Sequence, residues 1–173
     1  MQVRLSVATF ALALCPALAV AQSSPVAAAF RADAADIGKN LIAAAERMPA
    51  EKYTFKPTPA QMSFADIMEH LATGNDYLCG VVGGAKAPTR SEVTSKSSKD
   101  ALVARLKETF AFCDQALAAL DDSKLGEETN MFGKARSRAE IEFITVGDWA
   151  DHYSQFANYM RLNGVLPPTA KKS

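Results

Sequence analysis

The stretch of residues 146–155 holds the side chains of this sequence with the clearest capacity for chemistry. Asp148 and His152 are four residues apart, so on a helix of 3.6 residues per turn both side chains project from one face. Polar groups buried without partners cost about 2 kcal/mol or more each, so this pair needs partners in the core. Apolar residues fall on or beside the same stripe: Ile141, Ile144, Phe156, Tyr159 and Leu162.

The chain has one other histidine, His70, and it too lies beside an apolar stripe. Two imidazoles and one carboxylate, all aimed inward, form a ligand set that zinc, manganese or iron accepts. Three protein ligands also leave coordination positions for water or substrate. The residues leave a second interpretation open, in which Asp148 and His152 form a plain ion pair and His70 is a core histidine without a metal.

Four predicted helices would position these side chains. Apolar residues recur along each at steps of three or four, which gives a helix one apolar face. Long polar connections precede the third and the fourth helix and leave room for a crossover. No segment alternates strictly between apolar and polar residues, so we expect no sheet and predict an all-α four-helix bundle. The expected helices span residues 24–48, 63–83, 98–120 and 137–162.

Local signals mark the ends of these helices. Pro49 cannot continue the first helix, and Gly84 follows the last residue expected in the second. Ser63 with Asp66 three residues later resembles a capping box at the start of the second helix. Asp66 also lies one turn before His70 and could orient the imidazole as a hydrogen-bond acceptor. Of these two roles we favour the cap.

Residues 1–21 have the pattern of a cleaved export signal. Arg4 supplies one positive charge, residues 7–20 form an apolar run, and residues 19–21 are small enough for signal peptidase. The apolar run is too short to span a bilayer, which takes about 20 residues. We therefore expect a periplasmic or secreted protein with no integral membrane segment after signal cleavage, whose single domain comprises residues 22–173.

Charge and composition exclude nucleic acid as a partner. The 19 Lys and Arg residues balance 19 Asp and Glu residues, and no basic stripe or basic-aromatic alternation occurs. No glycine-rich phosphate-binding loop is present either. The partners that remain are a small-molecule substrate of unknown identity and a second copy of this chain, docked through an exposed helix face as a homodimer.

Two segments resemble the motifs of the DinB-like superfamily. The first is residues 53–57 (YTFKP) leading into residues 62–71 (MSFADIMEHL). The second is residues 152–155 (HYSQ), followed by residues 159–164 (YMRLNG) and a proline pair at 167 and 168. The resemblance covers the chain from about Phe30 to Pro168, with the motifs in the family's order and separation. It implies a four-helix bundle with a crossover between the second and third helices.

The resemblance also implies a divalent metal held by one histidine of the second helix and two of the fourth. His70 matches the first of these ligands and His152 matches the last. The remaining ligand position falls four residues before His152, where this chain has Asp148 instead of the usual histidine. We therefore predict a His/Asp/His metal site, with zinc as the first choice and nickel, iron or manganese as alternatives.

Characterised relatives in this superfamily include transferases and isomerases that use low-molecular-weight thiols. An exported protein has little access to the cytosolic thiol pool, so hydrolysis is the simpler expectation. The resemblance thus favours a metal-dependent hydrolase or transferase, with its substrate and catalytic residues unassigned. The alternative is a non-catalytic structural or stress-related bundle without a metal.

Cys79 and Cys113 each lie late in their own predicted helix. The crossover implied by the resemblance would make these two helices parallel and bring the two thiols to similar heights. A disulfide needs Cα atoms within about 7 Å and suits an oxidising compartment. Two unpaired thiols that pack as small apolar side chains are the alternative, and the sequence leaves both open.

Overall fold

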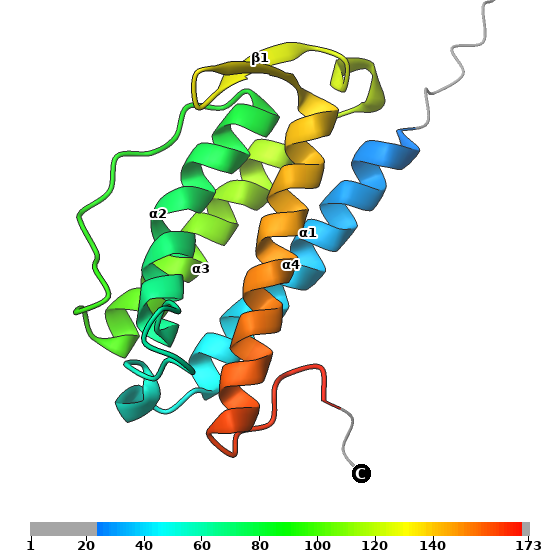
Figure 1. Ribbon diagram of the computed structural model, residues 1–173. Coiled ribbons are helices and arrows are strands. Elements are labelled where there is room, and N and C mark those ends of the chain that lie inside the picture. The colour runs from blue at the N-terminus through cyan, green and yellow to red at the C-terminus, as the bar shows by residue number, and fades with distance from the viewer. Residues whose placement is uncertain (1–23, 171–173) are drawn as a thin grey trace, which may run out of the picture.

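The structure is a computed structural model, and it describes residues 24–170. It confirms the predicted fold class, an all-α bundle of four helices (Figure 1). The helices are α1 (Pro25–Arg47), α2 (Phe64–Gly83), α3 (Lys99–Leu117) and α4 (Arg138–Leu162). Short elements join them: the 3-10 turns η1 (Ala50–Lys52) and η2 (Asp122–Lys124), and the strands β1 (Glu128–Met131) and β2 (Lys134–Ser137).

The helices run in two parallel pairs. In Figure 1, α1 and α4 descend from the end of the bundle that carries β1, whereas α2 and α3 ascend toward that end. The loop after α2 therefore passes down the outside of the bundle before α3 begins, which is the crossover that the resemblance implied.

One contiguous core fills the space between the helices. Apolar burial is the main favourable term, about 25 cal/mol for each Å² removed from water. Gly38 lets α1 approach α3 closely, because a Cβ there would lie 2.7 Å from the ring of Phe110. The largest fully buried side chains include Leu41, Met48, Phe64, Ile67, Leu102, Leu106, Ile141, Trp149, Phe156 and Tyr159.

The start of α2 is fixed by a reciprocal cap. The backbone N–H of Asp66 donates to Oγ of Ser63 at 3.1 Å, and the N–H of Ser63 donates to Oδ2 of Asp66 at 2.8 Å. These hydrogen bonds from Ser63 lower the pKa of the Asp66 carboxyl. The preferred role for Asp66, as a cap, is confirmed. Gly84 ends the helix with a left-handed backbone at φ 69°.

The expectation of no sheet was wrong. Strands β1 and β2 form an antiparallel hairpin in which Met131 pairs with Lys134, leaving Phe132 and Gly133 as a two-residue turn. Both turn residues have positive φ, 51° and 80°, as tight hairpin turns of type I′ require. Each strand is only four residues long, which is too short for a period of two to stand out in the sequence.

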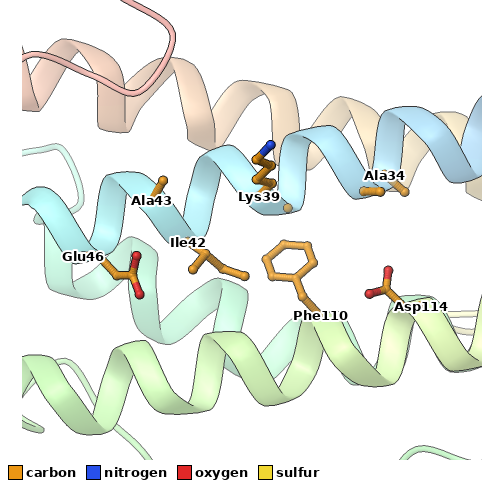
Figure 2. Close-up of a pocket in the computed structure, with 9 residues that line it drawn as sticks. Ala34, Lys39, Ile42, Ala43, Glu46, Phe110 and Asp114 are labelled. Carbon is orange, nitrogen blue, oxygen red and sulfur yellow. The ribbon is translucent and has the colours of Figure 1, made fainter.

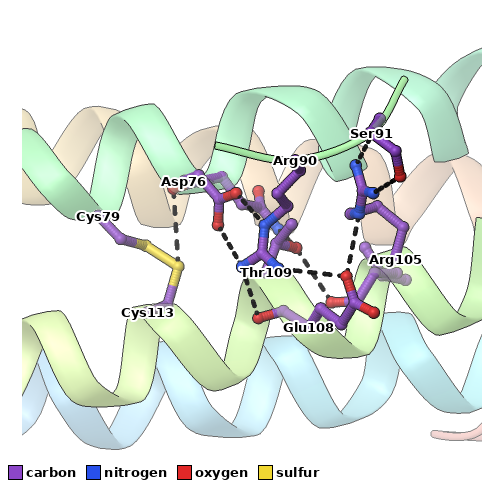
Figure 3. A network of polar contacts seen from close by, with 10 residues as sticks. Asp76, Cys79, Arg90, Ser91, Arg105, Glu108, Thr109 and Cys113 are labelled. Carbon is purple, nitrogen blue, oxygen red and sulfur yellow. Dashed lines mark hydrogen bonds and ion pairs between the residues drawn. A yellow bond between two sulfur atoms is a disulfide. The ribbon is translucent and has the colours of Figure 1, made fainter. Parts of the chain in front are cut away.

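Covalent and ionic links tie the crossover region together (Figure 3). Cys79 of α2 and Cys113 of α3 form a disulfide, with Cα atoms 5.0 Å apart. Of the two alternatives for the cysteines, the structure thus has the disulfide. The crossover loop is held by Arg90, which forms ion pairs with Asp76 of α2 and Glu108 of α3.

Residues 1–23 lie outside the part of the chain that the structure describes, and the predicted export signal falls within them. Within residues 24–170, none of the helices has the length and apolar character to cross a membrane.

Candidate metal centre

The structure brings His70, Asp148 and His152 together between α2 and α4. One candidate ligand atom from each residue lies within 4.8 Å of the other two. The α2 helix supplies His70, and the i, i+4 spacing on α4 puts Asp148 and His152 on one face, as the sequence predicted. No second group of three His, Cys, Asp or Glu residues gathers this closely within residues 24–170.

The separations of the two imidazoles from Asp148 lie within the range of ion pairs and are also close to the spacing of two ligands on one metal ion. Nε2 of His70 lies 3.6 Å from Oδ1 of Asp148, and Nε2 of His152 lies 3.5 Å from the same oxygen. N–H···O hydrogen bonds are usually about 2.7–3.2 Å long. Two atoms bound tetrahedrally to one zinc ion at about 2.0–2.2 Å lie about 3.3–3.5 Å apart, which is close to both distances from Asp148. The three ligand atoms together spread over up to 4.8 Å, so the two imidazoles would move closer together to share an ion.

The three side chains differ in their access to solvent. His152 is buried, and its Nδ1 has no hydrogen-bond partner among the described residues. Asp148 is half-buried, whereas the His70 side chain is 48% exposed. We expected all three side chains to point toward the interior, and this was wrong for His70, whose side chain is open to solvent.

The two imidazoles change the acidity of the carboxyl between them. Burial acts to raise the pKa of Asp148, but its interactions with His152 and His70 outweigh burial and lower the pKa below its ordinary value. The carboxylate form, which a metal ligand requires, is therefore favoured.

A buried hydrogen-bond chain positions α4 beside α2. The indole N–H of Trp149 donates to Oδ1 of Asn75 at 2.8 Å, and Nδ2 of Asn75 donates to Oγ1 of Thr109 in α3 at 3.2 Å. The Trp149 ring also packs edge-on against Phe110, with ring centres 5.0 Å apart. Because Trp149 directly follows Asp148, these contacts fix the α4 backbone where the carboxylate projects.

Glu69, the neighbour of His70, has a structural role. Its Oε2 accepts a hydrogen bond from the backbone N–H of Ser95 at 2.6 Å, which anchors the crossover loop to α2. No sequence pattern indicated this contact, because the loop that contains Ser95 has no periodic pattern.

A cavity of about 130 Å³ opens beside the group. Its polar side is formed by His70, Asp148 and Asn75. The hairpin supplies the part of the wall that sequence analysis missed, since no sheet was expected there. The remaining lining residues are Gly74, Leu78, Met131, Phe132 and Ile144.

A larger groove of about 370 Å³ lies on another side of the bundle, between α1 and α3 (Figure 2). Phe110 and Ile42 face each other across it, and the charged residues Lys39, Glu46 and Asp114 line it as well. None of the three predicted metal ligands lines this groove.

Fold and site together define a class of protein: a four-helix bundle with a crossover after its second helix and a His/Asp/His group between its second and fourth helices. Residues 36–158 match the family model of the DinB superfamily. This chain therefore belongs to the DinB superfamily, as the resemblance of its motifs implied.

Solved structures agree with this assignment at the level of the fold. A DinB-like protein from Bacillus cereus superposes with a TM-score of 0.68 at 14% identity, covering 82% of this chain and 95% of that one. A DinB-like protein from Bacillus subtilis gives 0.62 at 18% identity, covering 86% and 99%. A protein from Enterococcus faecalis gives 0.63 at 15% identity, covering 79% and 96%. A comparison with curated proteins found no match.

Proposed function

We propose that this protein binds one divalent metal through His70, Asp148 and His152 and acts on a small molecule as a metal-dependent hydrolase or transferase. The observation that carries the proposal is the position of Oδ1 of Asp148, 3.6 Å from one imidazole nitrogen and 3.5 Å from the other. This oxygen approaches both rings at the separation of atoms that share an ion. Zinc is the first choice, and nickel, iron or manganese are alternatives.

The openness of the site supports a catalytic role over a structural one. Structural zinc sites are closed by four protein ligands, whereas catalytic sites have three and keep a position open. The group has three residues within the described part of the chain. The His70 side chain is 48% exposed, and the cavity borders both His70 and Asp148.

A divalent ion in this position would supply Lewis-acid polarisation of a substrate oxygen and would lower the pKa of water. The chain's own residues divide the remaining tasks. His152 forms the buried, fixed side of the site, and His70 forms the side that solvent reaches. Asp148 cannot act as a general base while it holds the ion, so we assign it to ligation alone.

We also propose export to the periplasm or the cell exterior. The support lies in the signal-like pattern of residues 1–21 and in the disulfide between Cys79 and Cys113. Disulfides persist in oxidising compartments and are rare in the cytosol of most organisms.

Elemental analysis of protein purified without chelators tests the metal site. We expect about one equivalent of a transition metal in the wild type and none in His152→Ala, since a site of three ligands loses its buried member. Asp151→Asn is the matched control, because this exposed carboxylate lies on α4 and bonds only to Gln155 among the described residues. Equal metal content in the wild type and His152→Ala would overturn the proposal. Failure of the wild type to take up any added metal would favour the non-catalytic bundle.

A further inference from the structure

Phe132 occupies a position in the hairpin where a large side chain is unfavourable. It is the one non-glycine residue with positive φ among the described residues, at 51°. Such a conformation is a genuine outlier for a bulky residue and costs of the order of 1 kcal/mol or more. Asparagine is the residue that this turn position normally favours. The chain therefore places an aromatic ring there at a cost to its own stability.

Burial does not compensate for this cost. Phe132 remains 74% exposed, although the preceding residue of the hairpin, Met131, is buried at 4% exposure. The ring rests on Tyr77 of α2, with ring centres 4.7 Å apart, and the Phe132 N–H donates to the Tyr77 hydroxyl at 2.9 Å. These contacts hold the ring in place and leave most of its surface free for another molecule.

The cavity beside the metal centre is two-sided. Its polar side contains the predicted ligands His70 and Asp148, and its apolar side is lined by Leu78, Ile144 and Phe132. Its volume of about 130 Å³ approaches that of an apolar cavity of about 150 Å³ that binds benzene in another protein. The cavity can thus accept one apolar group the size of a phenyl ring.

Gly74 keeps this space free. It lies within α2, where glycine is less favourable than alanine by about 1 kcal/mol, and it lines the cavity. A Cβ at Gly74 would meet no atom within 4 Å, so neither close packing nor a positive φ requires glycine there. An empty position on the cavity wall is consistent with a bound ligand filling the space.

From these observations we infer that the substrate is a small amphiphile, in which a metal-coordinating oxygen group is attached to an apolar group about the size of a phenyl ring. The polar group would face His70 and Asp148, and the apolar group would enter the cavity under Phe132. Phe132 is then a specificity-determining residue. The inference rests on the proposed metal site.

Two hydroxamates test it, because both coordinate zinc and they differ in the apolar group. Benzohydroxamate carries a phenyl ring, and acetohydroxamate carries only a methyl group. Calorimetric titration of zinc-loaded wild type gives the ratio of the benzohydroxamate affinity to the acetohydroxamate affinity. This ratio should exceed the same ratio for free zinc by at least about tenfold, because the protein buries the phenyl ring. Phe132→Asn should weaken benzohydroxamate by about fivefold, the worth of one aromatic contact, and leave acetohydroxamate unchanged.

Two glycine variants provide a matched pair. Gly74→Leu fills the cavity and should abolish the preference for benzohydroxamate. Gly147→Leu introduces the same side chain on α4. A Cβ at Gly147 also meets no atom within 4 Å, but Gly147 does not line the cavity. This control should keep the wild-type preference.

Phe132→Asn must also keep or raise the thermal unfolding temperature, because asparagine suits the turn. A fall of more than about 5 °C would assign the ring to stability and overturn the inference. The inference would also be overturned if zinc-loaded protein bound both hydroxamates more tightly than free zinc by the same factor. In that case the metal site itself would stand. Protein that binds no zinc fails at the earlier step, and the proposed function fails with it.

Discussion

Asp148 is where this chain departs from the ligand pattern that the DinB resemblance implies. A carboxylate lowers the charge of the site by one relative to three histidines, and it presents an oxygen to the ion in place of a nitrogen. Nitrogen and sulfur ligands suit zinc and nickel, whereas carboxylates also suit manganese. The residue at this position should therefore set both the affinity and the metal preference.

We expect Asp148→His to keep zinc binding and to weaken manganese binding, because it restores an imidazole one turn before His152. Asp148→Asn should weaken zinc by at least about 100-fold, since loss of a residue that merely supports a ligand already costs about 10–100-fold. Competition titrations against a metal indicator would measure both. Wild-type zinc affinity in Asp148→Asn would show that the carboxylate is not a ligand.

Glu142 is a buried carboxyl that the metal centre does not use. It is 3% exposed, and its Oε1 has no hydrogen-bond partner among the described residues. Burial, together with the charge of Asp122, raises the pKa of Glu142 to about 7 against the opposing effect of Arg31. The ordinary value is 4.5, so between these pH values the folded chain binds a proton that the unfolded chain has released.

The sign of the pH effect follows from this proton. Stability should fall as pH rises from about 4.5 to about 7, because the unfolded chain releases a proton in this range that the folded chain retains. Glu142→Gln should be more stable than the wild type at pH 8, by about 3 kcal/mol, and the difference should vanish near pH 4. Urea unfolding at both pH values measures this, and a constant difference would contradict the assignment.

At the scale of the elements, the disulfide joins the two helices that the crossover loop separates. Cys79 and Cys113 are 34 residues apart and both are buried, at 0% and 1% exposure. Because the bond closes a long loop in the unfolded chain, its loss should lower the free energy of unfolding by about 3–4 kcal/mol. The buried sulfur atoms should react with reductant only after unfolding.

Denaturant unfolding with and without dithiothreitol checks this expectation. Reductant should lower the denaturant concentration at the unfolding midpoint of the wild type. It should leave the midpoint of the double variant Cys79→Ala and Cys113→Ala unchanged. A wild-type midpoint that does not respond to reductant would mean that the bond contributes nothing to stability.

The helices could be predicted from the sequence, whereas the hairpin could not. Apolar steps of three and four extend over many turns, and signals such as Pro49 and the Ser63–Asp66 cap act within a few residues. The hairpin has four-residue strands and a turn that begins with Phe132 in place of asparagine. Its position depends on long-range contacts with Tyr77, which no local pattern contains.

The candidate site divides in the same way. Asp148 and His152 share a helix face, so their proximity follows from the period of the helix alone. That His70 joins them depends on the packing of α2 against α4. The residue types and the resemblance to a family both suggested this grouping, but the period of a single helix could not establish it. The exposure of His70 and the cavity under Phe132 depend on how far α4 and the hairpin cover α2. These features arise from tertiary structure, which the sequence patterns did not reveal.

At the scale of the whole molecule, the proposed ion and the disulfide act on different pairs of helices. The disulfide joins α2 to α3, and His70, Asp148 and His152 would join α2 to α4. The Trp149–Asn75–Thr109 chain connects the same three helices through the core. A bound metal would therefore complete the set of links around α2, and its effect should extend to the stability of the entire fold.

We expect zinc to raise the temperature of global unfolding. A ligand that binds only the folded state adds about 2.7 kcal/mol at 100 times its dissociation constant, which corresponds to about 5–10 °C for a domain of this size. Differential scanning calorimetry with added zinc, and again after EDTA, measures the shift. EDTA should reverse it, and His152→Ala should show none, whereas Asp151→Asn should respond as the wild type does. An equal shift in His152→Ala would mean that zinc binds elsewhere on the chain, and it would contradict the proposed metal link between α2 and α4.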